Sequence, residues 1–301
     1  MDSSGEQFAD VGRGIELCYE TFGSREDPPV LLVMGLGMQL LGWLDDFCAE
    51  IAGEGFHVVR FDNRDTGRST SVDSPPPGLP QLATRRFAAG QYTLDDMADD
   101  AAGLLDALDL APAHVVGASL GGMIAQTLAH RHPRSVRTLT SIMSTTGSRL
   151  KGQPEMALMR VLLQRAPNDR DSFVEHFVKV FELIGSPELG KDADETREQA
   201  GRSFDRGTNP AGTGRQLGAI LKSGDRTKAL RGVRAPTLVI HGTKDRLVRP
   251  SGGKATAEAI PGAELMLVEG MGHDLPRAVW PQVVSAIVSR AHRYDGALQT
   301  A

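Results

Sequence analysis

The nine residues at positions 114–122 read HVVGASLGG, and they decide the fold of this 301-residue chain. The apolar start of this stretch is typical of a buried strand, and the chain after it has apolar residues at helical spacing as far as residue 130. The turn between them has the pattern Gly-x-Ser-x-Gly, with Ser119 at its centre. The pattern alone is weak evidence in a chain with 34 glycines, but its position between a strand and a helix makes it specific. We therefore predict that Ser119 is a nucleophile.

The residue types around Ser119 suit a sharp strand-to-helix turn. Gly117 and Gly121 lack side chains, so the strand before the serine and the helix after it can approach closely. Such a turn holds the serine in a strained backbone conformation, which has a free-energy cost of about 1–3 kcal/mol. The hydroxyl then stands above a helix N-terminus, whose dipole favours a developing negative charge.

Outward from this turn, short apolar segments alternate with segments of helical spacing. The predicted strands are residues 14–22, 30–34, 56–61, 114–116, 136–143, 237–241 and 264–268. The predicted helices between them are residues 43–52, 93–108, 120–130, 251–259 and 279–291. Strands that are apolar on both faces and alternate with helices are typical of a parallel sheet with helices on both faces. We therefore predict an α/β fold.

One segment interrupts this alternation. Residues 147–231 have only helical patterns, at 155–165, 170–183, 193–206 and 215–222. The simplest interpretation is a helical cap, residues 147–231, inserted into a core domain of residues 1–146 and 232–301. The proline-rich segment 74–90 is predicted to be a loop without regular structure.

A serine nucleophile needs a base that removes its proton and an acid that orients the base. Two predicted strands after Ser119 each lead to a candidate: residues 237–241 to Asp245, and residues 264–268 to His273. Both candidates follow the carboxyl end of a strand, the edge at which parallel sheets bind ligands. The chain order serine, aspartate, histidine is the order expected after this kind of turn. We predict a triad of Ser119, Asp245 and His273.

Each partner has an alternative interpretation. Asp245 alone could cap a turn, and His273 alone could be a surface histidine. Asp274 is a rival acid, but a side chain adjacent to His273 in sequence is directed elsewhere. The other seven histidines lie in predicted strands, on or just after a helix, in the predicted cap or near the C-terminus.

Acyl transfer also needs donors for the negative charge that develops on the carbonyl oxygen. We predict the backbone N–H groups of Leu120, directly after the nucleophile, and of Leu36, in the Gly-Leu-Gly turn that follows residues 30–34. The same turn could be a glycine-rich connection without a ligand. It lacks the third glycine of a dinucleotide-binding fingerprint, which argues against nucleotide binding at this turn.

Residues 62–69, DNRDTGRS, contain paired carboxylates and arginines, and we interpret them as a hydrogen-bonded turn that braces the sheet edge. No group of residues has metal-ligand spacing, so no metal is expected. The net charge of −5 and the lack of a Lys/Arg run argue against nucleic acid as a partner. Cys18 and Cys48 make no disulfide framework and are expected to be buried thiols.

The start of the sequence has no basic segment followed by an apolar one, and no apolar stretch reaches the length of a membrane span. We expect a soluble cytoplasmic protein without a transmembrane segment. The oligomeric state is left open by the sequence.

Several motifs together resemble a known family. Residues 31–35, 62–70, 114–119, 236–240 and 270–273 are similar to those of aclacinomycin methylesterase and related bacterial esterases and lipases of the α/β-hydrolase superfamily. The resemblance implies an eight-stranded mostly parallel sheet, a helical cap, the triad above and no cofactor. Met34 departs from the wider superfamily, where a histidine before the oxyanion glycine is common, but agrees with the methylesterase branch. No resemblance covers residues 147–231, so the substrate does not carry over.

The function predicted from the residues and the resemblance is a serine hydrolase that cleaves carboxylic esters through an acyl-enzyme on Ser119. Its partner is expected to be an apolar small-molecule ester. A methylesterase of a polyketide-type small molecule, a thioesterase and a lactonase are alternatives. A cofactor-free perhydrolase and a non-catalytic ligand-binding protein on the same fold remain as rivals of a different class. A dehalogenase or epoxide hydrolase would need an aspartate where Ser119 stands.

Overall fold

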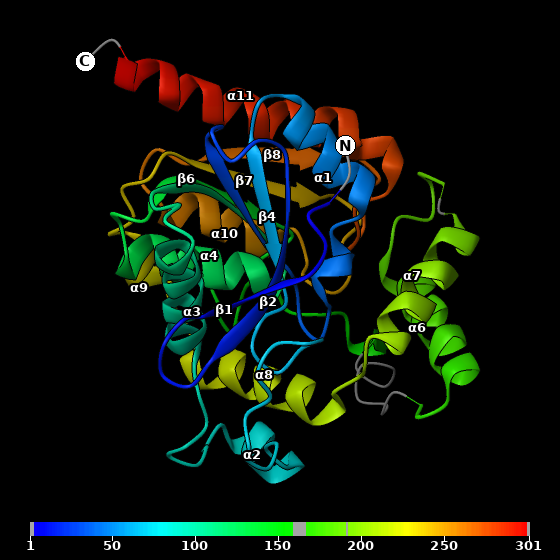
Figure 1. Ribbon diagram of the computed structural model, residues 1–301. Helices are drawn as coiled ribbons and strands as arrows, with labels where there is room; N and C mark the ends of the chain where they lie inside the picture. The colour runs from blue at the N-terminus through cyan, green and yellow to red at the C-terminus, as the bar shows by residue number, and fades with distance from the viewer. Residues whose placement is uncertain (1–2, 159–166, 191, 300–301) are drawn as a thin grey trace.

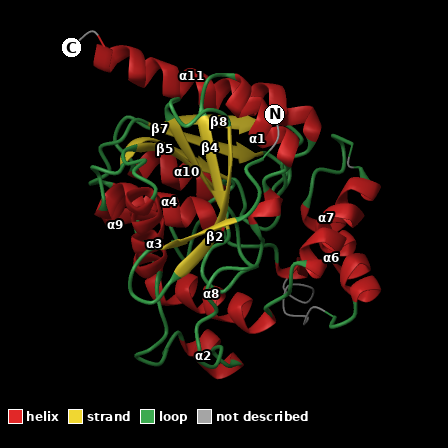
Figure 2. Cartoon of the chain, in the orientation of Figure 1, coloured by secondary structure: helices red, strands yellow, loops and turns green. Residues whose placement is uncertain are grey.

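The computed structural model describes residues 3–158, 167–190 and 192–299. Its strands form one sheet in the order β1-β2-β4-β3-β5-β6-β7-β8 (Figures 1 and 2). They are β1 (Gln7–Asp10), β2 (Glu16–Phe22), β3 (Pro29–Val33), β4 (His57–Phe61), β5 (Ala113–Ala118), β6 (Val136–Ile142), β7 (Thr237–Gly242) and β8 (Glu264–Val268). Strands β4, β3, β5, β6, β7 and β8 are parallel, whereas β1 and β2 pair antiparallel. The predicted mostly parallel eight-stranded sheet is confirmed.

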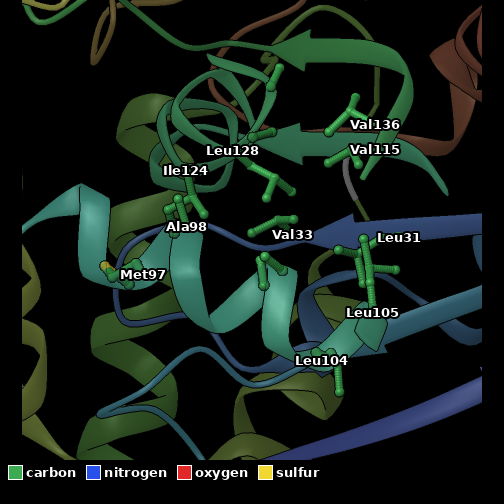
Figure 3. Packing of buried hydrophobic residues seen from close by; sticks show 14 of the residues in the cluster. Leu31, Val33, Met97, Ala98, Leu104, Leu105, Val115, Ile124, Leu128 and Val136 are labelled. Atoms are coloured by element: carbon green, nitrogen blue, oxygen red, sulfur yellow. The ribbon is translucent and has the colours of Figure 1, made fainter. Parts of the chain in front are cut away.

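Helices cover both faces of the sheet (Figure 1). One face packs against α3 (Leu94–Ala107), α4 (Leu120–Arg131) and α10 (Ser251–Ala259), and the other against α1 (Asp45–Gly53) and α11 (Trp280–Gln299). Successive residues of β3 alternate between the two cores: Leu31 faces α3 and α4, and Leu32 faces α1 and α11. In Figure 3, Leu31 lies beside Leu105 of α3, and Ile124 of α4 lies beside Ala98 of α3. Burial on both faces explains why the strand sequences are continuously apolar.

A short helix and a short strand were not predicted from the sequence. Segment 74–90 is not entirely irregular, because it contains the short helix α2 (Leu79–Thr84). Pro80 lies in the first turn of α2, where a proline removes no helical hydrogen bond, so the proline content does not prevent a helix there. Strand β1 was not predicted because only Ala9 of its four residues is buried, which leaves no apolar pattern to detect.

Between β6 and β7 the described chain is helical, as predicted. It contains α6 (Arg170–Ile184), α7 (Ala193–Asp205), α8 (Pro210–Ser223) and α9 (Thr227–Leu230). Helices α6 and α7 pack against each other beside the sheet, and α8 packs near α3 (Figure 1). Helix α8 begins before the predicted start at residue 215, because Asn209 caps it and Pro210 opens it. Most of the predicted helix 155–165 lies outside the described residues.

Short 3-10 helices η1 (Leu40–Gly42) and η2 (Arg277–Val279) complete the elements. In the parts of the chain that the structure describes, no helix combines the length and the apolar character that crossing a membrane requires.

Candidate active site

Ser119 lies at the turn between β5 and α4. Its backbone has φ 55° and ψ −117°, a conformation that residues with side chains rarely adopt. Its N–H donates to the carbonyl oxygen of Ile142 at the end of β6 (2.9 Å), and its own carbonyl accepts from the Ser144 hydroxyl (2.8 Å). Hydrogen bonds from the neighbouring strand end therefore hold the strained turn.

Gly117 and Gly121 allow the close packing that this turn needs. A Cβ atom on Gly117 would lie 2.2 Å from the carbonyl oxygen of Gly121. A Cβ atom on Gly121 would lie 1.9 Å from the carbonyl oxygen of Val33 in β3. Both neighbours are backbone atoms, which cannot turn aside as a side chain could. Any other residue at these positions would push the strand, the turn and the helix apart.

Asp245 and His273 meet Ser119 at the carboxyl edge of the sheet. Asp245 follows β7, His273 follows β8, and both side chains are buried. His273 Nε2 is 2.9 Å from Ser119 Oγ, and His273 Nδ1 is 2.8 Å from Asp245 Oδ2. The three predicted residues thus form one continuous series of hydrogen bonds, although they come from three different strand ends.

The surroundings of Asp245 keep its carboxylate charged and oriented. Oδ1 accepts from the backbone N–H groups of Leu247 (2.9 Å) and Val248 (2.8 Å), which leaves Oδ2 for His273. Burial by itself raises the pKa of Asp245, but the charge of His273 and hydrogen bonds from His241 and His273 outweigh burial and lower the pKa to about 2. Asp245 is therefore an acceptor at neutral pH.

A second histidine stands behind Asp245. His241 is fully buried, and its Nε2 is 2.7 Å from the carbonyl oxygen of Val248. A carbonyl only accepts, so this nitrogen carries a proton. The same nitrogen lies 3.4 Å from Asp245 Oδ2. The sequence indicates only that His241 lies in a strand, because its contact with Asp245 depends on how the chain turns after β7.

The rival acid Asp274 is engaged elsewhere. Its carboxylate accepts from the hydroxyl and the backbone N–H of Ser186, just after α6. Ser186 Oγ also accepts from the N–H of Gly272 (2.8 Å), and the His273 N–H donates to the carbonyl oxygen of Ile184 (2.7 Å). The end of α6 therefore holds the loop that carries His273. No sequence signal marked Ser186, since its partners lie almost ninety residues away.

The loop after β3 lies beside the nucleophile. A Cβ atom on Gly35 would be 3.4 Å from the Ser119 Cβ. Leu36 follows directly, and Leu120 begins α4, where the first backbone N–H groups have no partner inside the helix. Within the described part of the chain, neither the Leu36 N–H nor the Leu120 N–H donates to a protein acceptor. Both N–H groups therefore remain available to a ligand.

The carboxylates of the turn at residues 62–69 bind neighbouring segments of the chain. Asp62 Oδ1 accepts from the Leu40 N–H (2.7 Å), and Oδ2 accepts from the Arg68 N–H (3.0 Å) and from Arg206 (2.8 Å). The Asp65 carboxylate accepts from Nε and Nη2 of Arg215 on α8 (2.9 and 2.6 Å). These carboxylates are saturated by structural partners, which agrees with the structural interpretation of this turn.

The two cysteines are not candidate nucleophiles. Cys18 and Cys48 are free thiols, and burial raises the pKa of each to about 12. Across residues 3–158, 167–190 and 192–299, no group of three or more His, Cys, Asp or Glu residues could hold a metal ion. The three residues at the strand ends are therefore the candidate catalytic centre.

Comparison with known proteins assigns the family. A model of the alpha/beta hydrolase fold matches residues 28–276. The chain belongs to the α/β-hydrolase family. This α/β hydrolase is 30% identical to rhodomycin D methylesterase DauP of Streptomyces sp. (strain C5), and 31% identical to rhodomycin D methylesterase DnrP of Streptomyces peucetius. Each alignment covers 91% of this chain and 94% of the relative.

Solved structures agree on the fold of this α/β hydrolase. An enol-lactonase from Burkholderia xenovorans LB400 superposes with a TM-score of 0.71 at 23% identity, over 96% of this chain and 99% of that chain. A thermophilic esterase from Thermogutta terrifontis superposes with a TM-score of 0.72 at 22% identity, over 97% and 99%. These two likenesses show the fold alone. The resemblance predicted from the sequence motifs is confirmed by the methylesterase relatives and the family model.

Proposed function

We propose that this α/β hydrolase cleaves a carboxylic ester through an acyl-enzyme on Ser119. The observation that carries the proposal is the hydrogen-bonded series from Ser119 Oγ through His273 to Asp245 (2.9 and 2.8 Å). The methylesterases DauP and DnrP, similar over 91% of this chain, support a hydrolase that acts on ester bonds.

The geometry suits nucleophilic catalysis in two steps. His273 takes the proton of Ser119 as the hydroxyl oxygen attacks the acyl carbon, and then gives it to the leaving alcohol. Asp245 keeps Nδ1 protonated, so Nε2 is the nitrogen that accepts, and its negative charge stabilises the imidazolium. Water, activated by the same histidine, then attacks the acyl-enzyme and releases the acid and free Ser119.

The inserted segment, residues 147–231, is proposed to be a cap that shapes an apolar substrate site. Half-buried Phe173, Phe177 and Phe181 lie along α6, with neighbouring ring centroids 6.3 and 4.7 Å apart. A small cavity of about 70 Å³ joins Phe173 and Phe177 to Gly37 of the loop beside Ser119. Aromatic side chains next to that loop favour an apolar acyl or alcohol group.

A methyl ester is the second, finer candidate. It is favoured over a thioester or a lactone because both methylesterase relatives cover 91% of the chain, the inserted segment among it. A perhydrolase would use the same three residues, so Ser119 would be reactive in it as well. In a non-catalytic binding protein, Ser119 would be unreactive.

The direct test of the function uses a fluorophosphonate probe and a panel of p-nitrophenyl esters, methyl esters, thioesters and lactones. We expect stoichiometric labelling on Ser119, and a burst of p-nitrophenol when breakdown of the acyl-enzyme limits turnover. EDTA should change neither result, since no step requires a Lewis acid. An enzyme that hydrolyses none of these esters and resists the probe would contradict the proposal.

The oxyanion donors give a sharper prediction. Replacing Leu36 by proline removes its N–H, and one lost donor lowers turnover by about 10²–10³. Leu36→Ala keeps the N–H and should retain most of the turnover of a small ester. Circular dichroism and thermal melting must show that the proline variant is folded. If folded Leu36→Pro turns over esters at the wild-type rate, the second donor is another N–H of the loop.

A further inference from the structure

The loop that carries Leu36 is held at both ends by buried side chains of the core. The side-chain amide of Asn63 donates to the carbonyl oxygen of Met34 (3.0 Å). The carboxylate of Asp62 accepts from the N–H of Leu40 (2.7 Å). These two contacts locate the ends of the loop, but neither touches the peptide groups next to Leu36.

A side chain of the inserted segment binds the middle of the loop. Gln216, in α8, accepts the Gly37 N–H with its Oε1 (2.9 Å), and its side chain is fully buried. Its Nε2 donates to the carbonyl oxygen of Arg64 (2.8 Å) and to Thr66 Oγ1 (2.7 Å). Because the carbonyl of Arg64 can only accept, the amide cannot turn over, and the acceptor Oε1 must face Gly37.

A packing contact reinforces this hydrogen bond. Gly37 has φ 65°, and a Cβ atom there would lie 2.8 Å from Oγ1 and 3.0 Å from Cγ2 of Thr213. Thr213 precedes Gln216 by three residues and so lies on the same face of α8. Helix α8 therefore packs directly against the loop at Gly37.

We propose that Gln216 is a positioning residue for the oxyanion hole. By holding the Gly37 N–H, it fixes the peptide that follows Leu36, and with it the direction of the Leu36 N–H toward the oxygen bound at Ser119. This inference rests on the proposed ester hydrolysis. It means that the inserted segment contributes to the rate of the chemical step and not only to the choice of substrate.

The test compares Gln216→Met, which keeps length but removes the acceptor, with Gln216→Glu, which restores one. A carboxyl buried beside the Arg64 carbonyl takes up a proton, so it can accept from Gly37 and donate to Arg64. Gln91→Met is the matched control. Gln91 is also buried and its Nε2 donates to the Arg215 carbonyl in α8 (2.8 Å).

We expect Gln216→Met to lower kcat by about 10–100-fold with little change in KM, because a displaced donor weakens binding of the transition state more than of the substrate. The affinity for a trifluoromethyl ketone, whose adduct with Ser119 carries an oxyanion, should fall by the same factor. Gln216→Glu should recover most of both losses. Gln91→Met should lower the melting temperature and leave kcat and inhibitor affinity near wild type.

The outcomes separate this inference from the function on which it rests. If the wild-type protein is not labelled by the fluorophosphonate probe and does not hydrolyse esters, the proposed function itself is wrong. Active wild type together with a folded Gln216→Met of normal kcat, or an equal kcat loss in Gln91→Met, would overturn the positioning role alone. If Gln216→Met does not fold, Gln216→Asn carries the test: its amide is one methylene too short to reach Gly37, and it should show the same loss of kcat.

Discussion

Ser119→Ala should reduce ester turnover by about 10⁴–10⁶, the largest effect expected for this protein. In the proposed mechanism, the hydroxyl 2.9 Å from His273 Nε2 is the group that bonds to the acyl carbon, so its removal leaves only substrate binding and the proposed oxyanion donors. His273→Ala should cause a loss of similar size, because the proposed mechanism makes His273 the base that takes the proton of that hydroxyl. Steady-state kinetics with a p-nitrophenyl ester, on enzyme shown to be folded by thermal melting, measures both.

The double variant distinguishes a concerted unit from two independent contributors. Ser119→Ala with His273→Ala should be little worse than either change alone, because the base has no role without the nucleophile. His132→Ala is a suitable control, since that side chain is paired with Asp99 at the surface (2.7 Å). It should keep the wild-type rate. If the loss of turnover in the double variant equals the product of the two single losses, the two residues act independently and the triad is contradicted. Near-normal turnover by Ser119→Ala would show that Ser119 is not the nucleophile.

Asp245→Asn should lower turnover by about 10⁴ while leaving the protein folded. The backbone N–H groups of Leu247 and Val248 point at Oδ1, so the asparagine must place its carbonyl there and its NH₂ toward His273. An amide that donates to Nδ1 forces the proton onto Nε2, and that nitrogen can no longer take the proton of Ser119. The kinetic loss should therefore appear in kcat, measured at saturating ester.

The matched change is Asp274→Asn, which tests the rival acid. Asp274 binds Ser186 and does not face the imidazole of His273, so the loss of turnover should be far smaller than that of Asp245→Asn. Kinetics and melting curves of the two variants, measured side by side, give the ranking. The reverse ranking would assign the orienting role to Asp274.

Local sequence determined the parts of this protein that depend on neighbouring residues. A turn with Gly117, Ser119 and Gly121 between an apolar strand and a helix has few other conformations, because only glycine fits where backbone carbonyls lie about 2 Å from a Cβ position. The carboxyl ends of parallel strands meet at one edge, so the strand pattern alone was sufficient to place the candidates following β7 and β8 near Ser119. Continuous apolar strands likewise required helices on both faces.

Only the tertiary structure decided which polar side chains support these residues. Gln216 and Ser186 lie in a segment with no recognisable motif, and each reaches loops of the core across long stretches of chain. His241 meets Asp245 only because of the turn after β7. An amide or hydroxyl has the same sequence signature whether it is solvated or buried against a distant backbone group. Its role depends on which segments pack together, and packing is a property of the whole chain rather than of any local pattern.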